Sequence, residues 1–177
     1  MDKKELRKKI REQKRAMTEQ QIVAASQRLG ELFLACDQYQ NAKTIYGYLP
    51  YNQEVRTVPM LEQAMKDGKR VAVPKFYGEE MRFIYMDDLS KVEKGYANIP
   101  EPIADDPVAD DKTALVLMPG MAFTKDGKRM GYGGGFYDKF LAAEPDHPTV
   151  ALCYDFQMVE DLPTEEYDIP VDCVLWA

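Results

Sequence analysis

The chain has 177 residues, of which 45% are hydrophobic, enough apolar material to bury one core of ordinary size but not two. Its formal net charge of −7 at pH 7 excludes an overall field that attracts nucleic acid or anionic lipid. We therefore expect one domain, residues 1–177, with no nucleic-acid partner and no membrane partner. Any anionic ligand must be held by locally gathered Lys and Arg side chains.

The cysteines and the N-terminus indicate a cellular compartment. Cys36, Cys153 and Cys173 are odd in number, far apart and without a C-x-x-C pair, which argues against a disulfide framework or a structural zinc site. The first residues lack the apolar stretch of a signal peptide, and no run approaches the roughly 18 apolar residues of a membrane span. We expect a cytoplasmic protein that acts as a monomer.

Two helices are predicted within the first 35 residues. Asp2 with Glu5, and Thr18 with Gln21, have the spacing of capping boxes. The second helix has one apolar stripe, formed by Ile22, Ala25, Leu29 and Phe33. The first helix carries eight of the Lys and Arg residues between positions 3 and 15, which makes it the most basic segment of an acidic protein.

Between residues 44 and 86, β-rich runs alternate with one helical run. We expect first a strand at 44–50, which leads into a loop that contains Glu54. A helix should follow, starting near Pro59 and stopping at Gly68. Two further strands are expected, one from Arg70 that ends at Pro74 and one at 81–86.

The second half predicts a surface excursion followed by further strands. Residues 87–111 contain many charges, three prolines and one glycine, a composition typical of a long surface segment. Apolar runs then predict strands at 114–118, 149–154 and 171–176, with a helix at 136–143. Alternating strands and helices predict a layered α/β fold with a largely parallel sheet, whose ligand crevice lies at the carboxyl ends of the strands.

The stretch from residue 118 to residue 141 has the order strand, loop, glycine cluster, helix. Four of the five residues from Gly131 to Gly135 are glycine, so several backbone N–H groups could approach one anion at the start of a helix. Lys125, Lys128 and Arg129 add charge. A tight turn that needs positive φ would explain the same glycines equally well. Asp138, in the first turn of this helix, either compensates the helix dipole or holds a divalent cation.

The commonest nucleotide and hydrolase motifs are absent from the sequence. A dinucleotide-binding G-x-G-x-x-G from Gly131 would need glycine where Phe136 stands, and a P-loop would need Ser or Thr where Arg129 follows Gly127-Lys128. His147 is the only histidine, and no Ser-His-Asp or Cys-His set can be assembled around it. We expect His147 to lie in a surface turn.

The segment from Pro119 to Asp138 resembles the signature Pro-Gly-x-x-Phe-(Asp/Thr)-x-x-Gly-x-Arg-(Leu/Met)-Gly-x-Gly-x-Gly-(Tyr/Phe)-Tyr-Asp of the 5-formyltetrahydrofolate cyclo-ligase family, also called 5,10-methenyltetrahydrofolate synthetases. The resemblance covers nearly the whole chain, through Lys3 with Arg7, Leu49 with Glu54, and Asp168 after Leu162-Pro163. It implies a three-layer α/β sandwich with a mainly parallel sheet, Rossmann-like and of the NagB/RpiA/CoA transferase type.

The resemblance also implies an activity and a set of site residues. The reaction is 5-formyltetrahydrofolate plus ATP giving 5,10-methenyltetrahydrofolate, ADP and phosphate, with Mg2+ required. Arg129 would be catalytic, and Asp138 and Asp168 would bind the metal. Leu49, Glu54 and Tyr132 to Phe136 would contact the folate. The implied ATP contacts are Lys3, Lys4, Arg7, Lys128, Arg129, Met130, Gly131, Tyr132, Gly133, Gly134, Gly135, Phe136 and Tyr137.

Two positions depart from the family pattern. Arg56 stands two residues after Glu54, where many members carry an acidic residue, and Phe136 replaces the usual tyrosine. Taken without the resemblance, the N-terminal bases also fit a solvated helix face, Glu54 an ordinary loop carboxylate and Asp168 a turn residue. Two other functions stay open: a non-catalytic module that binds folate or nucleotide, and another small-molecule ATP-dependent enzyme, such as a kinase.

Overall fold

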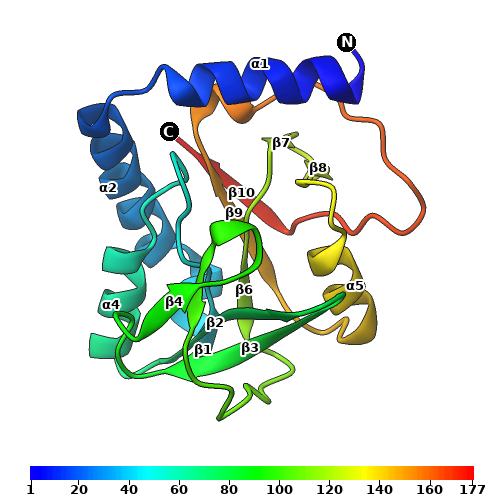
Figure 1. The fold of residues 1–177 in the computed structure, drawn as a ribbon. Coiled ribbons are helices and arrows are strands. Elements are labelled where there is room, and N and C mark those ends of the chain that lie inside the picture. The colour runs from blue at the N-terminus through cyan, green and yellow to red at the C-terminus, as the bar shows by residue number, and fades with distance from the viewer.

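The computed structural model describes residues 1–177 and contains five α-helices and ten strands (Figure 1). The helices are α1 (Lys3–Arg15), α2 (Glu19–Ala35), α3 (Asp37–Asn41), α4 (Val58–Lys66) and α5 (Phe136–Ala143). The strands are β1 (Thr44–Tyr46), β2 (Arg70–Tyr77), β3 (Glu80–Met86), β4 (Val92–Lys94), β5 (Pro100–Pro102), β6 (Leu115–Met118), β7 (Ala122–Phe123), β8 (Arg129–Met130), β9 (Thr149–Cys153) and β10 (Cys173–Trp176).

Six strands form one sheet in the order β10-β9-β6-β1-β2-β3. All neighbouring pairs are parallel except the β2–β3 hairpin. The chain leaves β1 toward β2 on one side and later enters β6 on the other side, so the strand order reverses between β1 and β6. Crevices for ligands form beyond the carboxyl ends of strands at such a switch point. The predicted α/β class with a mainly parallel sheet is confirmed.

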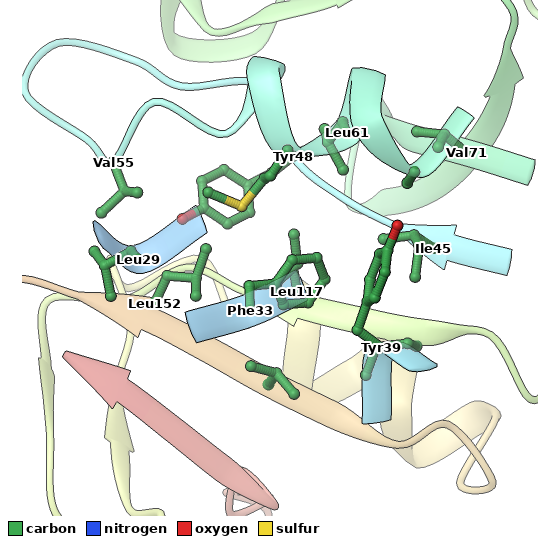
Figure 2. Close-up of a cluster of buried hydrophobic side chains, with 14 of the residues drawn as sticks. Leu29, Phe33, Tyr39, Ile45, Tyr48, Val55, Leu61, Val71, Leu117 and Leu152 are labelled. Carbon is green, nitrogen blue, oxygen red and sulfur yellow. The ribbon is translucent and has the colours of Figure 1, made fainter. Parts of the chain in front are cut away.

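Helices cover both faces of the sheet, which gives three layers. On one face α2, α3 and α4 pack on the strands through a cluster that includes Leu29, Phe33, Tyr39, Leu61 and Leu117, as Figure 2 shows. On the other face α5 contributes Tyr137 and Leu141 to a second cluster. The apolar stripe predicted on the second helix therefore faces the core, since Leu29 and Phe33 are fully buried.

Helix α1 lies across the edge of the sheet at which β9 ends (Figure 1). Its N-terminal capping box is formed by Asp2 and Glu5, and that of α2 by Thr18 and Gln21, as predicted. The helix is anchored by Ile10, which is 1% exposed and packs in a small cluster with Met121, Ala122, Met130 and Leu162. None of the helices combines the length and hydropathy needed to cross a membrane.

The prediction that the second strand ends at Pro74 is wrong, because β2 continues to Tyr77. Alternate residues of a strand direct their N–H and C=O groups to the same neighbour. The carbonyl of Ala72 accepts a hydrogen bond from Gly47 N–H, so the nitrogen of Pro74 also points to the β1 side. Strand β1 has already ended at Tyr46, so the missing N–H of Pro74 breaks no ladder hydrogen bond.

Two further expectations need correction. The excursion at 87–111 lies on the surface, but it contains the β4–β5 hairpin and a short 3-10 turn at Tyr96–Asn98. His147 is not in a surface turn: it is 5% exposed, with Nδ1 at 2.7 Å from the carbonyl oxygen of Ala114 and Nε2 at 2.9 Å from Glu144. The three cysteines are free, as expected.

Candidate active site

A cavity of about 610 Å³ lies between α1 and the loops that follow β1 and β6. Seven segments line it: α1, the loop at 48–54, the end of β2, the turn at 96–100, the loop at 119–121, the segment from Arg129 to Asp138, and residues 167–168. The volume is in the range of small-molecule sites. A cavity of this size therefore lies at the β1/β6 switch point.

One wall of the cavity is strongly cationic. Lys3, Arg7, Arg11 and Arg15 follow one another at steps of four residues, so a helix places them along one face, and all four line the cavity with Lys14. Arg7 Nε is buried without a hydrogen-bond partner. In a protein of net charge −7, this face concentrates positive charge where an anionic ligand can reach it.

The guanidinium of Arg129 is held from two sides at the cavity floor. One terminal nitrogen donates to the carbonyl of Pro119 at 2.8 Å, and the other lies 3.5 Å from an oxygen of Asp138. The side chain is 6% exposed, and its Nε has no partner. Buried donors are nearly always satisfied, so this nitrogen is a candidate for a hydrogen bond to ligand oxygen.

The glycines from Gly131 to Gly135 are required by the backbone itself. Gly133 has φ of 105° and Gly135, which caps the N-terminus of α5, has φ of 69°. A Cβ on Gly134, where φ is not positive, would lie 2.7 Å from the ring of Phe136. The tight-turn interpretation is thus confirmed for two of the glycines. The same turn leads into a helix N-terminus, so anion binding there stays a prediction.

Two acidic residues, Asp138 and Asp168, line the cavity near Arg129. Asp138 accepts a hydrogen bond from the backbone N–H of Ile169 at 3.1 Å, which brings the neighbouring Asp168 to the start of α5. Asp168 in turn accepts one from Glu165 N–H at 2.7 Å. No group of three or more His, Cys, Asp or Glu side chains that could hold a metal occurs. Two carboxylates suit Mg2+, because phosphate oxygens and water commonly complete the coordination shell of this ion.

Glu54 is fixed in the opposite wall. Its Oε1 accepts a hydrogen bond from Tyr51 N–H at 2.8 Å, and its Oε2 accepts one from the Tyr132 hydroxyl at 3.2 Å. Desolvation raises the pKa of Glu54, and the charge of Lys14 is the largest of the effects that oppose the rise. The Glu54 carboxylate is therefore held in one orientation at the cavity, and its contact with a folate stays a prediction.

Three aromatic rings form the remaining wall. Phe76, at the end of β2, lies 4.8 Å from Phe136 and 5.3 Å from Tyr96 between ring centroids, and Tyr96 lies 5.5 Å from Phe136. Tyr96 is 52% exposed, so this wall opens to solvent. Edge-to-face clusters of this kind suit a flat aromatic ligand.

Comparison with known proteins assigns the chain to a family. The family model of the 5-formyltetrahydrofolate cyclo-ligase family matches residues 1–177. The 5-formyltetrahydrofolate cyclo-ligase of Escherichia coli K12 is 32% identical over 173 residues, which are 94% of this chain and 95% of that protein. The mouse protein of the same name is 28% identical over 188 residues, covering 98% of this chain and 93% of the relative.

The chain belongs to the 5-formyltetrahydrofolate cyclo-ligase family. The fold agrees with solved structures that resemble it. The 5,10-methenyltetrahydrofolate synthetase of Aquifex aeolicus superposes with a TM-score of 0.85 at 28% identity, covering 99% of this chain and 90% of that one. The 5,10-methenyltetrahydrofolate synthetase of Mycoplasma pneumoniae has a TM-score of 0.78 at 24% identity, covering 98% of both chains, and supports the fold alone.

Most residues that the cyclo-ligase signature implies are brought together by the fold. Those that line the cavity are Lys3, Arg7, Leu49, Glu54, Arg129, Met130, Gly131, Tyr132, Gly133, Gly134, Gly135, Phe136, Tyr137, Asp138 and Asp168. Lys4 and Lys128 do not line it: Lys4 is exposed, and Lys128 forms an ion pair with Asp161 at 2.7 Å. The roles of all these residues stay predictions.

Several cavity residues lie outside the cyclo-ligase signature. No sequence pattern indicates Phe76 and Tyr96, because aromatic residues at these positions fit a core or a surface position equally well. Arg11 and Arg15 could have been found by continuing the four-residue step from Lys3 and Arg7. Lys14 could not, because only the packing of α1 distinguishes it from the exposed bases around it.

Proposed function

We propose that this protein converts 5-formyltetrahydrofolate to 5,10-methenyltetrahydrofolate at the cavity described above, with ATP giving ADP and phosphate. One observation carries the proposal: a single cavity unites a basic helix face, a glycine loop with Arg129, two adjacent carboxylates and an oriented Glu54. Membership of the cyclo-ligase family supports it. We propose further that one domain suffices and that the protein acts as a cytoplasmic monomer on small molecules alone.

The chemistry needs positioning and charge neutralisation more than a protein nucleophile. The formyl oxygen of the substrate attacks the γ-phosphorus of ATP. A bond forms between this oxygen and phosphorus, the bond between phosphorus and the β,γ-bridging oxygen breaks, and ADP leaves. The resulting iminium phosphate is attacked at the formyl carbon by N10 of the folate. The C–O bond then breaks, phosphate leaves with both electrons, and the N10 proton passes to solvent. Enzymes accelerate such steps mainly by orientation and by fixed charges.

Each wall of the cavity has a part in this reaction. Lys3 and Arg7 bind the negative charge of the triphosphate, and the backbone N–H groups of Gly133 to Gly135 orient its end. Arg129 stabilises the charge that develops on the transferring phosphoryl group. Glu54 binds and orients the folate, whose flat rings lie against the aromatic wall.

The two carboxylates are the proposed site of a divalent cation. Asp138 and Asp168 would hold Mg2+ together with phosphate oxygens. Bound there, Mg2+ supplies positive charge to the phosphates during transfer. Asp138 also holds Arg129, so the same carboxylate keeps the guanidinium beside the phosphate site.

The direct test mixes purified protein with ATP, MgCl2 and 5-formyltetrahydrofolate. We expect the methenyl chromophore to appear together with equal amounts of ADP and phosphate, and neither to appear when ATP is omitted or replaced by a non-hydrolysable analogue. A protein that forms no ATP-dependent chromophore would contradict the proposal.

The same experiment separates the two other functions. A binding module would bind folate or ATP in calorimetry with no turnover. A kinase would release ADP but place the phosphoryl group on a stable product, which 31P NMR would detect in place of inorganic phosphate.

A further inference from the structure

Lys14 occupies an unusual position for a lysine. It is 8% exposed and is the one buried base among the eight of α1. It lies on the inward face of the helix, four residues after the buried Ile10 and three before Met17, where an apolar residue is expected. An ammonium group loses much hydration at such a position, so its retention requires polar partners.

Those partners form a chain of hydrogen bonds across the cavity. Lys14 Nζ lies 3.3 Å from the Tyr132 hydroxyl oxygen, which lies 3.2 Å from Glu54 Oε2 and 3.4 Å from the carbonyl oxygen of Gly120. An ammonium only donates and a carboxylate only accepts, so Lys14 donates to Tyr132. The single hydroxyl proton of Tyr132 then goes preferentially to the charged acceptor, Glu54.

The chain joins three segments that are far apart in sequence. Lys14 belongs to α1, Glu54 to the loop after β1, and Tyr132 to the glycine loop before α5. The ring of Tyr132 is 50% exposed, although its hydroxyl end meets Lys14 and Glu54. A half-exposed ring contributes little to the core, so its contacts serve the cavity and not the stability of the fold.

The electrostatics of Lys14 and Glu54 are mutually dependent. Desolvation lowers the pKa of Lys14 and raises that of Glu54, and the charge of each is the largest effect that opposes the shift of the other. Arg56 is the only other cation that acts on Glu54. The charge of Arg129 acts on Tyr132, and that of Asp155 on Cys153. Several other groups around the pair have raised pKa values and are neutral near pH 7; they are Tyr48, Tyr132, Tyr137, Tyr154 and Cys153.

We propose that Lys14 is a positioning residue for the folate: acting through Tyr132, it keeps Glu54 an ionised, oriented acceptor for an N–H group of the substrate. The inference rests on the proposed function, because it takes folate as the ligand of Glu54. Lys14 itself need not touch the substrate. Removing its charge should therefore weaken folate binding.

The test compares Lys14→Met with Lys14→Arg, and uses Lys9→Met as a control on an exposed base of the same helix. Calorimetry with 5-formyltetrahydrofolate alone should show a Kd about tenfold higher for Lys14→Met, the size of one lost charge-assisted hydrogen bond. Lys14→Arg keeps the cation and should stay within about threefold of wild type. Lys9→Met, at an exposed position that does not line the cavity, should match wild type in its affinity for both folate and ATP.

The pH dependence gives a readout that packing alone would not change. Loss of the Lys14 cation raises the pKa of Glu54 further, so Glu54 becomes protonated at higher pH. Folate affinity, measured as a function of pH, should fall on the acidic side as Glu54 becomes protonated. This acidic limb should lie at higher pH in Lys14→Met than in wild type, and should not move in Lys14→Arg.

Tyr132→Phe tests the same role of Lys14 by removing the hydroxyl that links it to Glu54. The ring of Tyr132 is half-exposed, so we expect the loss of one hydroxyl to leave the fold intact. Tyr132→Phe should move the acidic limb in the same direction, and the double variant with Lys14→Met should bind folate no worse than the weaker single variant. Unfolding midpoints measured by circular dichroism identify any variant that does not fold.

The outcomes distinguish this inference from the proposed function. A wild-type protein without ATP-dependent methenyl formation would overturn the function itself. An active wild type whose folate affinity is unchanged by Lys14→Met would overturn only the role of Lys14. Equal losses in Lys14→Met and Lys14→Arg, with no movement of the acidic limb, would show that Lys14 acts through packing.

Discussion

Arg129 is bound to protein groups before any ligand arrives. Pro119 and Asp138 fix two of its nitrogens and leave the third, Nε, without a partner. A guanidinium held in this way needs no reorganisation when charge develops on a phosphoryl group. The role depends on planar, forked geometry, which an ammonium cannot reproduce.

We expect Arg129→Ala to lower kcat by about 100-fold, because one preorganised donor to the transition state is lost. Steady-state assays of methenyl formation measure kcat and both KM values. Arg129→Lys should restore only part of the activity. Arg82→Ala is the matched control, since Arg82 is exposed on β3 and pairs only with Glu80. A rise in the KM for folate with kcat unchanged would contradict the assigned role.

Asp138 and Asp168 allow a second prediction at the residue scale. Asp138→Asn and Asp168→Asn should each raise the Mg2+ concentration needed for half-maximal activity, because a neutral amide is a poorer ligand for a hard cation. Magnesium titrations of the activity at saturating ATP measure this. Asp146→Asn, at an exposed position after α5, is the control. If Asp138 only compensates the helix dipole, its substitution will leave the magnesium requirement unchanged.

At the scale of elements, α1 is the part of the site with the weakest attachment. It contacts the rest of the protein through the small cluster around Ile10, which includes Ala122 of β7 and Met130 of β8, and through the hydrogen bond from Lys14 to Tyr132. Yet it supplies the entire cationic wall. Segments with few buried contacts open at a lower free energy than the sheet does.

Ile10→Ala should therefore loosen α1 without unfolding the sheet. The truncation of a buried isoleucine costs about 2–5 kcal/mol, most of it borne by the docking of α1. Amide hydrogen exchange should become faster in residues 3–15 and not in β6 or β9, and ATP should bind more weakly in calorimetry. Lys8→Ala, at an exposed position of the same helix, should change neither. Uniformly faster exchange throughout the chain would show that α1 is part of the global folding unit.

The elements that sequence patterns predicted well are those with local signals. The capping boxes at Asp2 and Thr18 and the start of α5 at Phe136 depend on residues three or four positions apart, and all three are confirmed. The end of β2 was mispredicted because Pro74 is tolerated only through the early end of β1, a strand that comes 24 or more residues before it. The β4–β5 hairpin was missed for a related reason, since prolines occupy both ends of β5.

At the scale of the whole molecule, the site depends on sheet topology. The signature from Pro119 to Asp138 indicated the glycine loop and its charges, but the distance between that loop and Glu54 or Lys14 is set by the adjacency of β1 and β6. No periodicity in the sequence encodes that adjacency. Tyr96 enters the cavity only because the surface hairpin folds back against Phe76.

The same topology predicts where stability resides. Phe33, on α2, is fully buried in the core cluster that Figure 2 shows. Leu32, its neighbour in the same helix, is 37% exposed. Phe33→Ala should cost about 3–5 kcal/mol through lost burial and the cavity that remains. For a chain of this length, that corresponds to an unfolding midpoint lower by roughly 6–20 °C. Leu32→Ala should lower it far less, and thermal unfolding followed by circular dichroism compares the two. Equal losses would mean that α2 is held by its own helical propensity and not by the sheet beneath it.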